Sequence, residues 1–186
     1  MDVRRPPYRQ EEFVARQHEL EMIRSALAQA CQGEVQERSI FHIWGTPCIG
    51  KSWLLNHLAH LYAGSDAPFP GCEIRTMLFD CEAVVQQRDS RAALLRRTQE
   101  ELIDSNSIGA TGGTGVDDLA AALCADPAAK FLLFDDANLL PDEDFAWLEQ
   151  RLLAPLASTD RVVIVVSGHE EAPRWREFET RRRLGH

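Results

Sequence analysis

Gly45-Thr46-Pro47-Cys48-Ile49-Gly50-Lys51-Ser52 is the stretch that decides the fold of this chain. It matches the pattern G-x-x-x-x-G-K-[S/T], in which glycines let the backbone curl until several N–H groups point into one concavity that attracts phosphate oxygens. The pattern is informative only where a buried strand precedes it and a helix follows it. Here the apolar run 40–44 precedes it, and residues 51–61 follow with leucines at helical spacing. The sequence therefore predicts a phosphate-binding loop.

Lys51 and Ser52 have the chemistry expected of such a loop. Lys51 is predicted to lie against the β- and γ-phosphates of a nucleotide, and the hydroxyl of Ser52 to ligate magnesium. The following helix adds the positive end of its dipole. Only Lys51 and Lys130 among the basic residues are lysines, which suggests that the loop needs a compact point charge. The residues of this region predicted to bind the nucleotide are Gly45, Thr46, Pro47, Cys48, Ile49, Gly50, Lys51, Ser52 and Trp53.

A second signal is the apolar run 131–134, which ends in two acids, Asp135 and Asp136. An apolar strand that ends in acids is typical of the element that organises magnesium in nucleoside triphosphatases. We assign Asp135 to the metal, together with Ser52, and Asp136 to polarising the attacking water. The alternative for each acid is a helix cap or a turn residue.

The predicted strand 161–167 ends in Ser167, and His169 follows after one glycine. Ligands of open α/β sheets bind beyond the carboxyl ends of the strands. Ser167 is therefore a candidate catalytic residue, and His169 a candidate for contact with the γ-phosphate. Polar residues also follow strands simply because loops are polar, and that alternative stays open.

Four apolar segments predict strands, at residues 40–44, 74–80, 130–136 and 161–167. Helical segments separate them, so the sequence predicts an α/β fold of three layers, α/β/α, with a mostly parallel sheet covered on both faces. A length of 186 residues favours a single domain over 1–186. Residues 1–12 are predicted to form an irregular leader.

Composition argues against several classes of protein. A net charge of −9 disfavours a general nucleic-acid-binding surface, because that affinity comes mainly from neutralised phosphates. No apolar run approaches the roughly 18 residues that span a bilayer, and residues 1–10 lack the apolar core of a signal peptide. We therefore expect a cytoplasmic protein with no membrane-spanning segment.

Cysteines and arginines have ordinary structural interpretations. The five cysteines include no Cys-x-x-Cys pair, so we expect no disulfide and a small apolar side chain at each cysteine except Cys48. The tail is basic, and a solvated helix face is favoured there over a phosphate or partner contact. Its arginines are Arg174, Arg176, Arg181, Arg182 and Arg183.

The predicted ligand is ATP or ADP with magnesium. Guanine-binding switches have an Asn/Thr-Lys-x-Asp element, and neither Lys51 nor Lys130 lies in one. The segment Phe13-Val14-Ala15-Arg16-Gln17-His18-Glu19-Leu20 resembles the Phe-Val-Gly-Arg-x-x-Glu-Leu opening of STAND ATPases, relatives of the AAA+ class that include NACHT and NB-ARC proteins. The pair Asp135-Asp136 is similar to their Walker B element, and residues 145–156 and 162–169 resemble their fourth helix and sensor strand.

The resemblance implies a slow switch that holds ADP at rest and exchanges it for ATP when triggered. Such proteins self-associate and activate attached domains, so C-terminal sensor or effector domains are expected as partners. The resemblance also places Val14 and Arg16 near adenine and ribose, and Ser167 at the first sensor position.

Three residues depart from the family pattern. Ala15 replaces a usual glycine, which is a mild change. Cys48 replaces another frequent glycine, a change that restricts the loop or makes it redox-sensitive. His169 replaces an arginine, which brings γ-phosphate sensing into question.

The chain reaches His186 soon after the fourth predicted strand. We therefore expect the N-terminal part of a longer protein, truncated before the fifth strand and the helical lid, with slow ATP hydrolysis. One alternative is a motor or loader AAA+ ATPase that acts on DNA or protein, which an Asp-Asp rather than an Asp-Glu pair disfavours. A small-molecule kinase and a pseudo-ATPase that binds nucleotide without hydrolysing it are further alternatives.

Overall fold

The computed structural model describes residues 16–63, 69–104, 115–169 and 175–185. Five strands form one sheet in the order β2-β3-β4-β1-β5, and every pairing is parallel. The strands are β1 (Ile40–Trp44), β2 (Ile74–Asp80), β3 (Ala129–Asp135), β4 (Val162–Gly168) and β5 (Leu184–Gly185). The first four confirm the predicted strands and the predicted parallel sheet.

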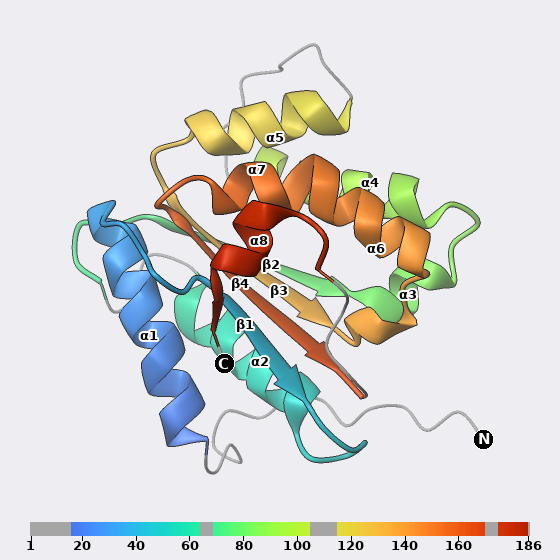
Figure 1. Ribbon diagram of the computed structural model, residues 1–186, viewed down its shortest axis with the longest axis horizontal. Coiled ribbons are helices and arrows are strands. Elements are labelled where there is room, and N and C mark those ends of the chain that lie inside the picture. The colour runs from blue at the N-terminus through green and yellow to red at the C-terminus, as the bar shows by residue number, and fades with distance from the viewer. Residues whose placement is uncertain (1–15, 64–68, 105–114, 170–174, 186) are drawn as a thin grey trace.

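Helices cover both faces of the sheet, which gives three layers (Figure 1). One face carries α1 (Gln17–Gln32) and α2 (Lys51–Tyr62). The other face carries α3 (Cys81–Val85), α4 (Ser90–Asp104), α5 (Val116–Ala125), α6 (Asp142–Leu148) and α7 (Ala154–Ala157). A short helix, α8 (Phe178–Arg182), lies against α7 and leads into β5.

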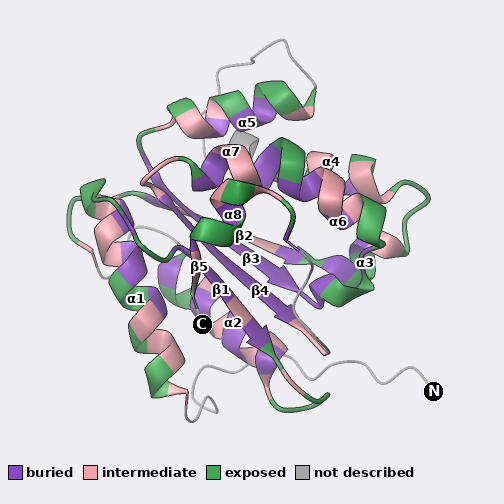
Figure 2. Cartoon of the chain, viewed as in Figure 1, coloured by how far each residue is buried: buried purple, intermediate pink, exposed green. Residues whose placement is uncertain are grey.

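The central strand β3 shows why the strands have continuous apolar sequences. Every residue of β3 is buried, as the purple strands of Figure 2 illustrate. Phe131 and Leu133 pack in the core under α1 and α2, whereas Leu132 and Phe134 pack in the core on the opposite face. Successive side chains of a strand point to opposite faces, so a strand buried on both sides needs apolar residues at each position.

The helix predicted over residues 142–156 contains a π-helical turn. Residues of α6 run into this turn, Glu149–Leu153 (η3), and then into α7. Pro155 lies in the first turn of α7. Because proline has no backbone N–H and clashes with the carbonyl four residues earlier, an α-helical ladder cannot continue unchanged through this position.

A fifth strand is present, so the expectation that the chain ends before it is wrong. Leu184 and Gly185 pair with Ile40 and Phe41 at the edge of β1. The segment that leads to β5 is anchored by Glu149, which is fully buried. Its carboxylate accepts hydrogen bonds from the backbone N–H groups of Arg176 and Glu177 and from the Thr180 hydroxyl.

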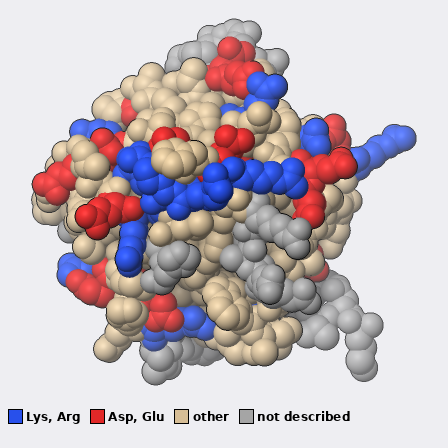
Figure 3. Space-filling view, in the orientation of Figure 1, with Lys and Arg blue, Asp and Glu red and all other residues tan. Residues whose placement is uncertain are grey.

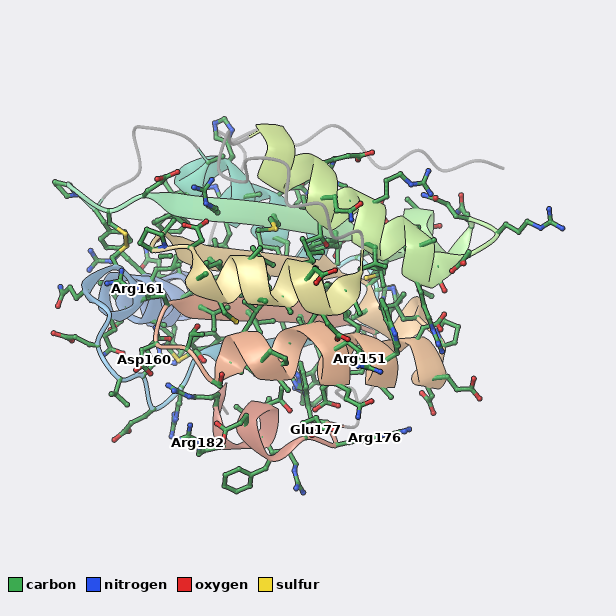
Figure 4. The ribbon with its side chains drawn as sticks, turned by 90° about the horizontal axis from the view of Figure 1, so that it is seen from above. Arg151, Asp160, Arg161, Arg176, Glu177 and Arg182 are labelled. Atoms are coloured by element: carbon green, nitrogen blue, oxygen red, sulfur yellow. A yellow bond between two sulfur atoms is a disulfide. The ribbon has the colours of Figure 1, made fainter. Side chains whose placement is uncertain are left out.

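The prediction of a solvated basic tail is wrong for Arg183. That guanidinium is 3% exposed, and it donates to the Gln36 carbonyl and, at 2.9 Å, to Asp160 Oδ1. Arg176 and Arg182 do project from the surface around α8 (Figure 4). Lys and Arg side chains form a band across this face, over the area that α8 occupies (Figure 3). Arg174 lies outside the described residues.

The expectation of no disulfide is also wrong. Cys31, in the last turn of α1, is bonded to Cys72, which precedes β2, and their Cα atoms are 5.5 Å apart. The two cysteines are 41 residues apart in the sequence, so only the packing of α1 against the sheet brings them together. Cys81 is buried as predicted, Cys124 is half-buried, and Cys48 is exposed. None of the helices in the described part of the chain is long and apolar enough to cross a membrane.

Candidate nucleotide-binding site

The predicted phosphate-binding loop connects the end of β1 to the start of α2. Gly45, Cys48 and Gly50 all have positive φ, at 147°, 64° and 84°. A Cβ on Gly45 would lie 2.5 Å from Ile49 Cδ1, so this position has no room for a side chain. Gly50 is the N-cap of α2 and has open space around it, so its backbone conformation alone favours glycine. The loop therefore curls in front of a helix N-terminus, where backbone N–H groups attract anions.

Lys51 lies inside this curl and is 4% exposed. Its ammonium donates hydrogen bonds to the carbonyl oxygens of Gly45 and Thr46, at 2.9 and 3.0 Å. Its third contact is with Nδ1 of His169, at 3.4 Å. The positive charge of Lys51 is thus held at the centre of the loop, close to the end of β4.

Ser52 and Ser167 converge on the same acid, Asp135. The Ser52 hydroxyl donates to Asp135 Oδ1 at 3.1 Å, which connects α2 to the end of β3. The Ser167 hydroxyl, on β4, donates to the same oxygen at 2.7 Å and accepts from the backbone N–H of Asp136 at 3.0 Å. Asp135 is 3% exposed, so these hydroxyl groups fix the direction of a buried carboxylate.

Asp136 follows Asp135 in the chain, but its backbone is in the left-handed conformation. Its φ of 53° ends the strand abruptly, and a short 3₁₀ turn, Ala137–Leu139 (η2), follows. The side chain is 3% exposed, and its Oδ1 lies 3.3 Å from Nε2 of His169. Asp136 therefore reaches the same region as Lys51, through His169.

The donor set fits magnesium held together with a nucleotide. Among the described residues there is no group of three or more His, Cys, Asp or Glu side chains that could hold a metal ion by themselves. Magnesium with a bound nucleotide needs fewer protein ligands, because phosphate oxygens and water complete its octahedron. The Ser52 hydroxyl and the Asp135 carboxylate, already in contact, are a suitable pair for that role.

Comparison with known proteins agrees with this geometry. The family model for the AAA domain matches residues 18–175. This chain belongs to the AAA domain family. No curated protein matches it significantly. Among solved structures, this AAA domain is similar to Cdc6p from Pyrobaculum aerophilum, with a TM-score of 0.63 and 18% sequence identity. The match covers 97% of this chain and 45% of that one, so the chain spans less than half of its length.

Arg16 connects the start of α1 to the phosphate-binding loop of the AAA domain. Its guanidinium donates to the Ile49 carbonyl at 2.9 Å and forms an ion pair with Glu19 at 3.2 Å. Arg16 thus contacts the loop through its side chain, and its place near adenine and ribose stays a prediction. Val14, its predicted companion, lies outside the described residues. Thr46, Pro47, Cys48 and Ile49 form the exposed rim of the loop, and Trp53 is half-buried in the first turn of α2.

Asn138 is a residue of the site that the sequence analysis missed. Its Oδ1 accepts the backbone N–H of His169 at 3.1 Å. A Cβ on Gly168 would lie 3.1 Å from the same oxygen, so β4 and η2 approach closely here. Asn138 follows the acid pair by two residues, at the sheet edge where ligands bind, and that position was the available signal.

Cys81 is a free, buried cysteine near the acids. Burial, with a further contribution from the negative charges of Asp135, Asp80 and Asp136, raises the pKa of its thiol strongly. The thiol is therefore protonated and inert.

Proposed function

We propose that this AAA domain binds ADP and ATP with magnesium and acts as the regulatory switch module of a STAND-type signalling ATPase, with slow hydrolysis. The contact that supports this most directly is the hydrogen bond from Ser52 to Asp135, because it joins the phosphate-binding loop to the acid strand at one potential magnesium position. In the full-length protein we propose self-association and C-terminal sensor or effector domains. A cytoplasmic location is part of the same proposal.

In this proposal each residue near the phosphates has a defined task. The loop N–H groups and Lys51 bind phosphate oxygens, and Ser52 and Asp135 hold magnesium, which would neutralise phosphate charge. Ser167 keeps Asp135 oriented, since its hydroxyl bridges Asp135 and the Asp136 backbone. Asp136 is assigned the task of polarising the attacking water. The proposal assigns Val14 and Arg16 to the base and ribose.

The test is titration of fluorescent ADP and ATP with magnesium against the wild type and Lys51→Ala. Loss of a hydrogen bond to a charged group costs about 1.5–3 kcal/mol, so we expect roughly tenfold to hundredfold weaker binding in the variant. Arg24→Ala is the matched control, because Arg24 is an exposed α1 cation that pairs with Glu21 on the same helix. Equal affinity of Lys51→Ala and the wild type, or preference for guanine, would contradict the proposal.

A pseudo-ATPase is the second candidate, favoured by the engagement of Asp136 with His169. Turnover of Asp136→Asn separates the two candidates. A fall in turnover with unchanged nucleotide affinity supports the slow enzyme, and unchanged turnover supports a nucleotide that is bound only as a structural ligand. Stimulation of turnover by added DNA would instead indicate a motor or loader ATPase.

A further inference from the structure

The side chain of Arg16 connects the start of α1 to a loop that lies 33 residues further along the chain. Its Nη2 donates to the Ile49 carbonyl at 2.9 Å, and its Nη1 donates to Glu19 Oε1 at 3.2 Å. Glu19 lies in the first turn of α1. A guanidinium presents its donors in a fixed planar fork, so a partner on one nitrogen also sets the direction of the other. The ion pair with Glu19 therefore aims Arg16 at the loop.

The backbone of Arg16 is also unusual. Its φ of 65° and ψ of 33° lie in the left-handed region, which a residue with a side chain adopts only at a cost in free energy. Arg16 is the N-cap residue of α1, and its side chain makes no capping hydrogen bond to the described residues of that helix. The preferred N-cap residues are Ser, Thr, Asp and Asn. Capping of α1 does not explain an arginine at this position, whereas the contact with the loop does.

The Ile49–Gly50 peptide is the group whose direction this contact sets. The peptide is trans, and in a trans peptide the C=O and N–H groups point in opposite directions. Arg16 bonds the Ile49 carbonyl from outside the loop. Lys51 bonds other carbonyls of the loop from inside the curl. The N–H of Gly50 therefore points away from Arg16.

Steric repulsion alone does not fix this peptide plane. Gly50 has a φ of 84° and open space where a Cβ would be, and glycine adopts either sign of φ readily. The Ile49 side chain, by contrast, lies over Gly45, because its Cδ1 is 2.5 Å from the place that a Cβ on Gly45 would take. The side chain of Ile49 is thus seated on the loop, and the hydrogen bond from Arg16 holds its carbonyl.

We propose that Arg16 is a positioning residue for phosphate, which holds the Ile49 carbonyl outward so that the Gly50 N–H is presented to a phosphate oxygen. A cation at the carbonyl oxygen also polarises the peptide, which makes its N–H a stronger donor. This inference rests on the proposed function, because it assumes that the loop binds phosphate groups. It goes beyond the assignment of Arg16 to the base and ribose, since it places the effect of Arg16 at the phosphates.

The experiment measures the binding of pyrophosphate with magnesium, a ligand without base or ribose, by displacement of fluorescent ADP. Arg16→Gly is the test variant, because glycine suits the left-handed backbone at this position. We expect pyrophosphate to bind about fivefold to tenfold more weakly, the effect of one lost hydrogen bond, and ADP to lose at least as much. Arg16→Lys retains a cationic donor and should bind pyrophosphate more tightly than Arg16→Gly. Arg24→Ala, which removes another cation of α1, should match the wild type.

Salt dependence separates positioning from simple attraction between charges. When the salt concentration rises from about 0.1 to 1 M, the Debye length falls from about 10 to 3 Å. An effect that depends only on the charge of Arg16 would then shrink. A positioned N–H group acts in direct contact with the ligand, so the ratio of affinities between the wild type and Arg16→Gly should persist.

Unchanged pyrophosphate affinity in Arg16→Gly overturns this inference, even if ADP binds more weakly, because Arg16 then has no effect at the phosphates. A loss that Arg16→Lys does not reduce also overturns it, and so does a loss that disappears in high salt. If Arg16→Gly shows no cooperative thermal unfolding, Arg16→Met, which keeps an apolar stem without donors, takes its place. Absence of both ADP and pyrophosphate binding in the wild type, by contrast, overturns the proposed function itself.

Discussion

Cys48 lies in the phosphate-binding loop with a φ of 64°, between two glycines whose φ angles are also positive. A left-handed backbone at a non-glycine residue costs on the order of 1–3 kcal/mol. The sequence analysis expected Cys48 to restrict the loop because glycine is frequent at this position in similar proteins. The positive φ of Cys48 is the physical reason for this restriction, and the exposed thiol does not contribute to it.

Substitutions of Cys48 test this backbone requirement. Cys48→Gly relieves the left-handed strain, so we expect it to bind ADP at least as tightly as the wild type. Cys48→Val places a β-branched residue at positive φ, which is strongly disfavoured, and we expect about tenfold weaker binding, or ~1.4 kcal/mol. The measurement is titration of fluorescent ADP, with thermal unfolding as a check that both variants fold. Equal affinities of the Gly and Val variants would show that the loop tolerates either backbone.

At the scale of elements, Glu149 connects the π-helical turn to the segment that carries α8 and β5. Its buried carboxylate accepts from two backbone N–H groups and from Thr180. Glu149→Gln replaces one acceptor oxygen with an NH₂ group that faces donors. Because a buried unsatisfied group and a lost charged hydrogen bond each cost 1–3 kcal/mol, we expect the free energy of unfolding to fall by about 3 kcal/mol.

Urea unfolding measures this loss, and limited proteolysis should show earlier cleavage around α8. Glu179→Gln, on α8, is the matched control, because Glu179 forms a surface pair with Arg182 at 2.7 Å. Surface pairs contribute about 0–1 kcal/mol, so this variant should unfold close to the wild type. If Glu149→Gln and Glu179→Gln lower the free energy of unfolding by the same amount, Glu149 does not anchor the C-terminal segment.

At the scale of the whole molecule, the Cys31–Cys72 disulfide closes a long loop of chain that includes β1, the phosphate-binding loop and α2. A cross-link of this length stabilises a protein typically by 2–4 kcal/mol, mainly by restricting the unfolded chain. We expect a reducing agent to lower the midpoint of thermal unfolding by roughly 4–16 °C, given 2–4 °C per kcal/mol for a chain of this size.

The variants identify which cysteines are responsible. Cys31→Ala combined with Cys72→Ala should unfold at the same temperature with and without reductant. Cys124→Ala should keep the full response, since Cys124 is a free thiol. An identical midpoint for the wild type in both conditions would mean that the bond does not form in solution. The result also bears on the proposed cytoplasmic location, because structural disulfides are rare in the cytosol.

Local patterns in the sequence determined the sheet and the loop. The apolar runs of β1, β2, β3 and β4 predicted strands because a strand buried on both faces excludes polar residues along its whole length. Leucine spacing predicted α2, and the glycines with Lys51 and Ser52 predicted the phosphate-binding loop. Asp135, Asp136, Ser167 and His169 were candidates because each ends or follows a strand, and the carboxyl ends of parallel strands meet at one edge of the sheet.

Only the tertiary structure decided how these side chains combine and which distant segments meet. The hydrogen bonds of Asp135 with Ser52 and Ser167, and the contacts of His169 with Lys51 and Asp136, join residues from different strands and helices. Local periodicity contains no information about such pairs. The two-residue β5, the buried Arg183 and the Cys31–Cys72 bond escaped prediction for the same reason. Each is stabilised by partners far along the chain, which become neighbours only when the helices pack on the sheet.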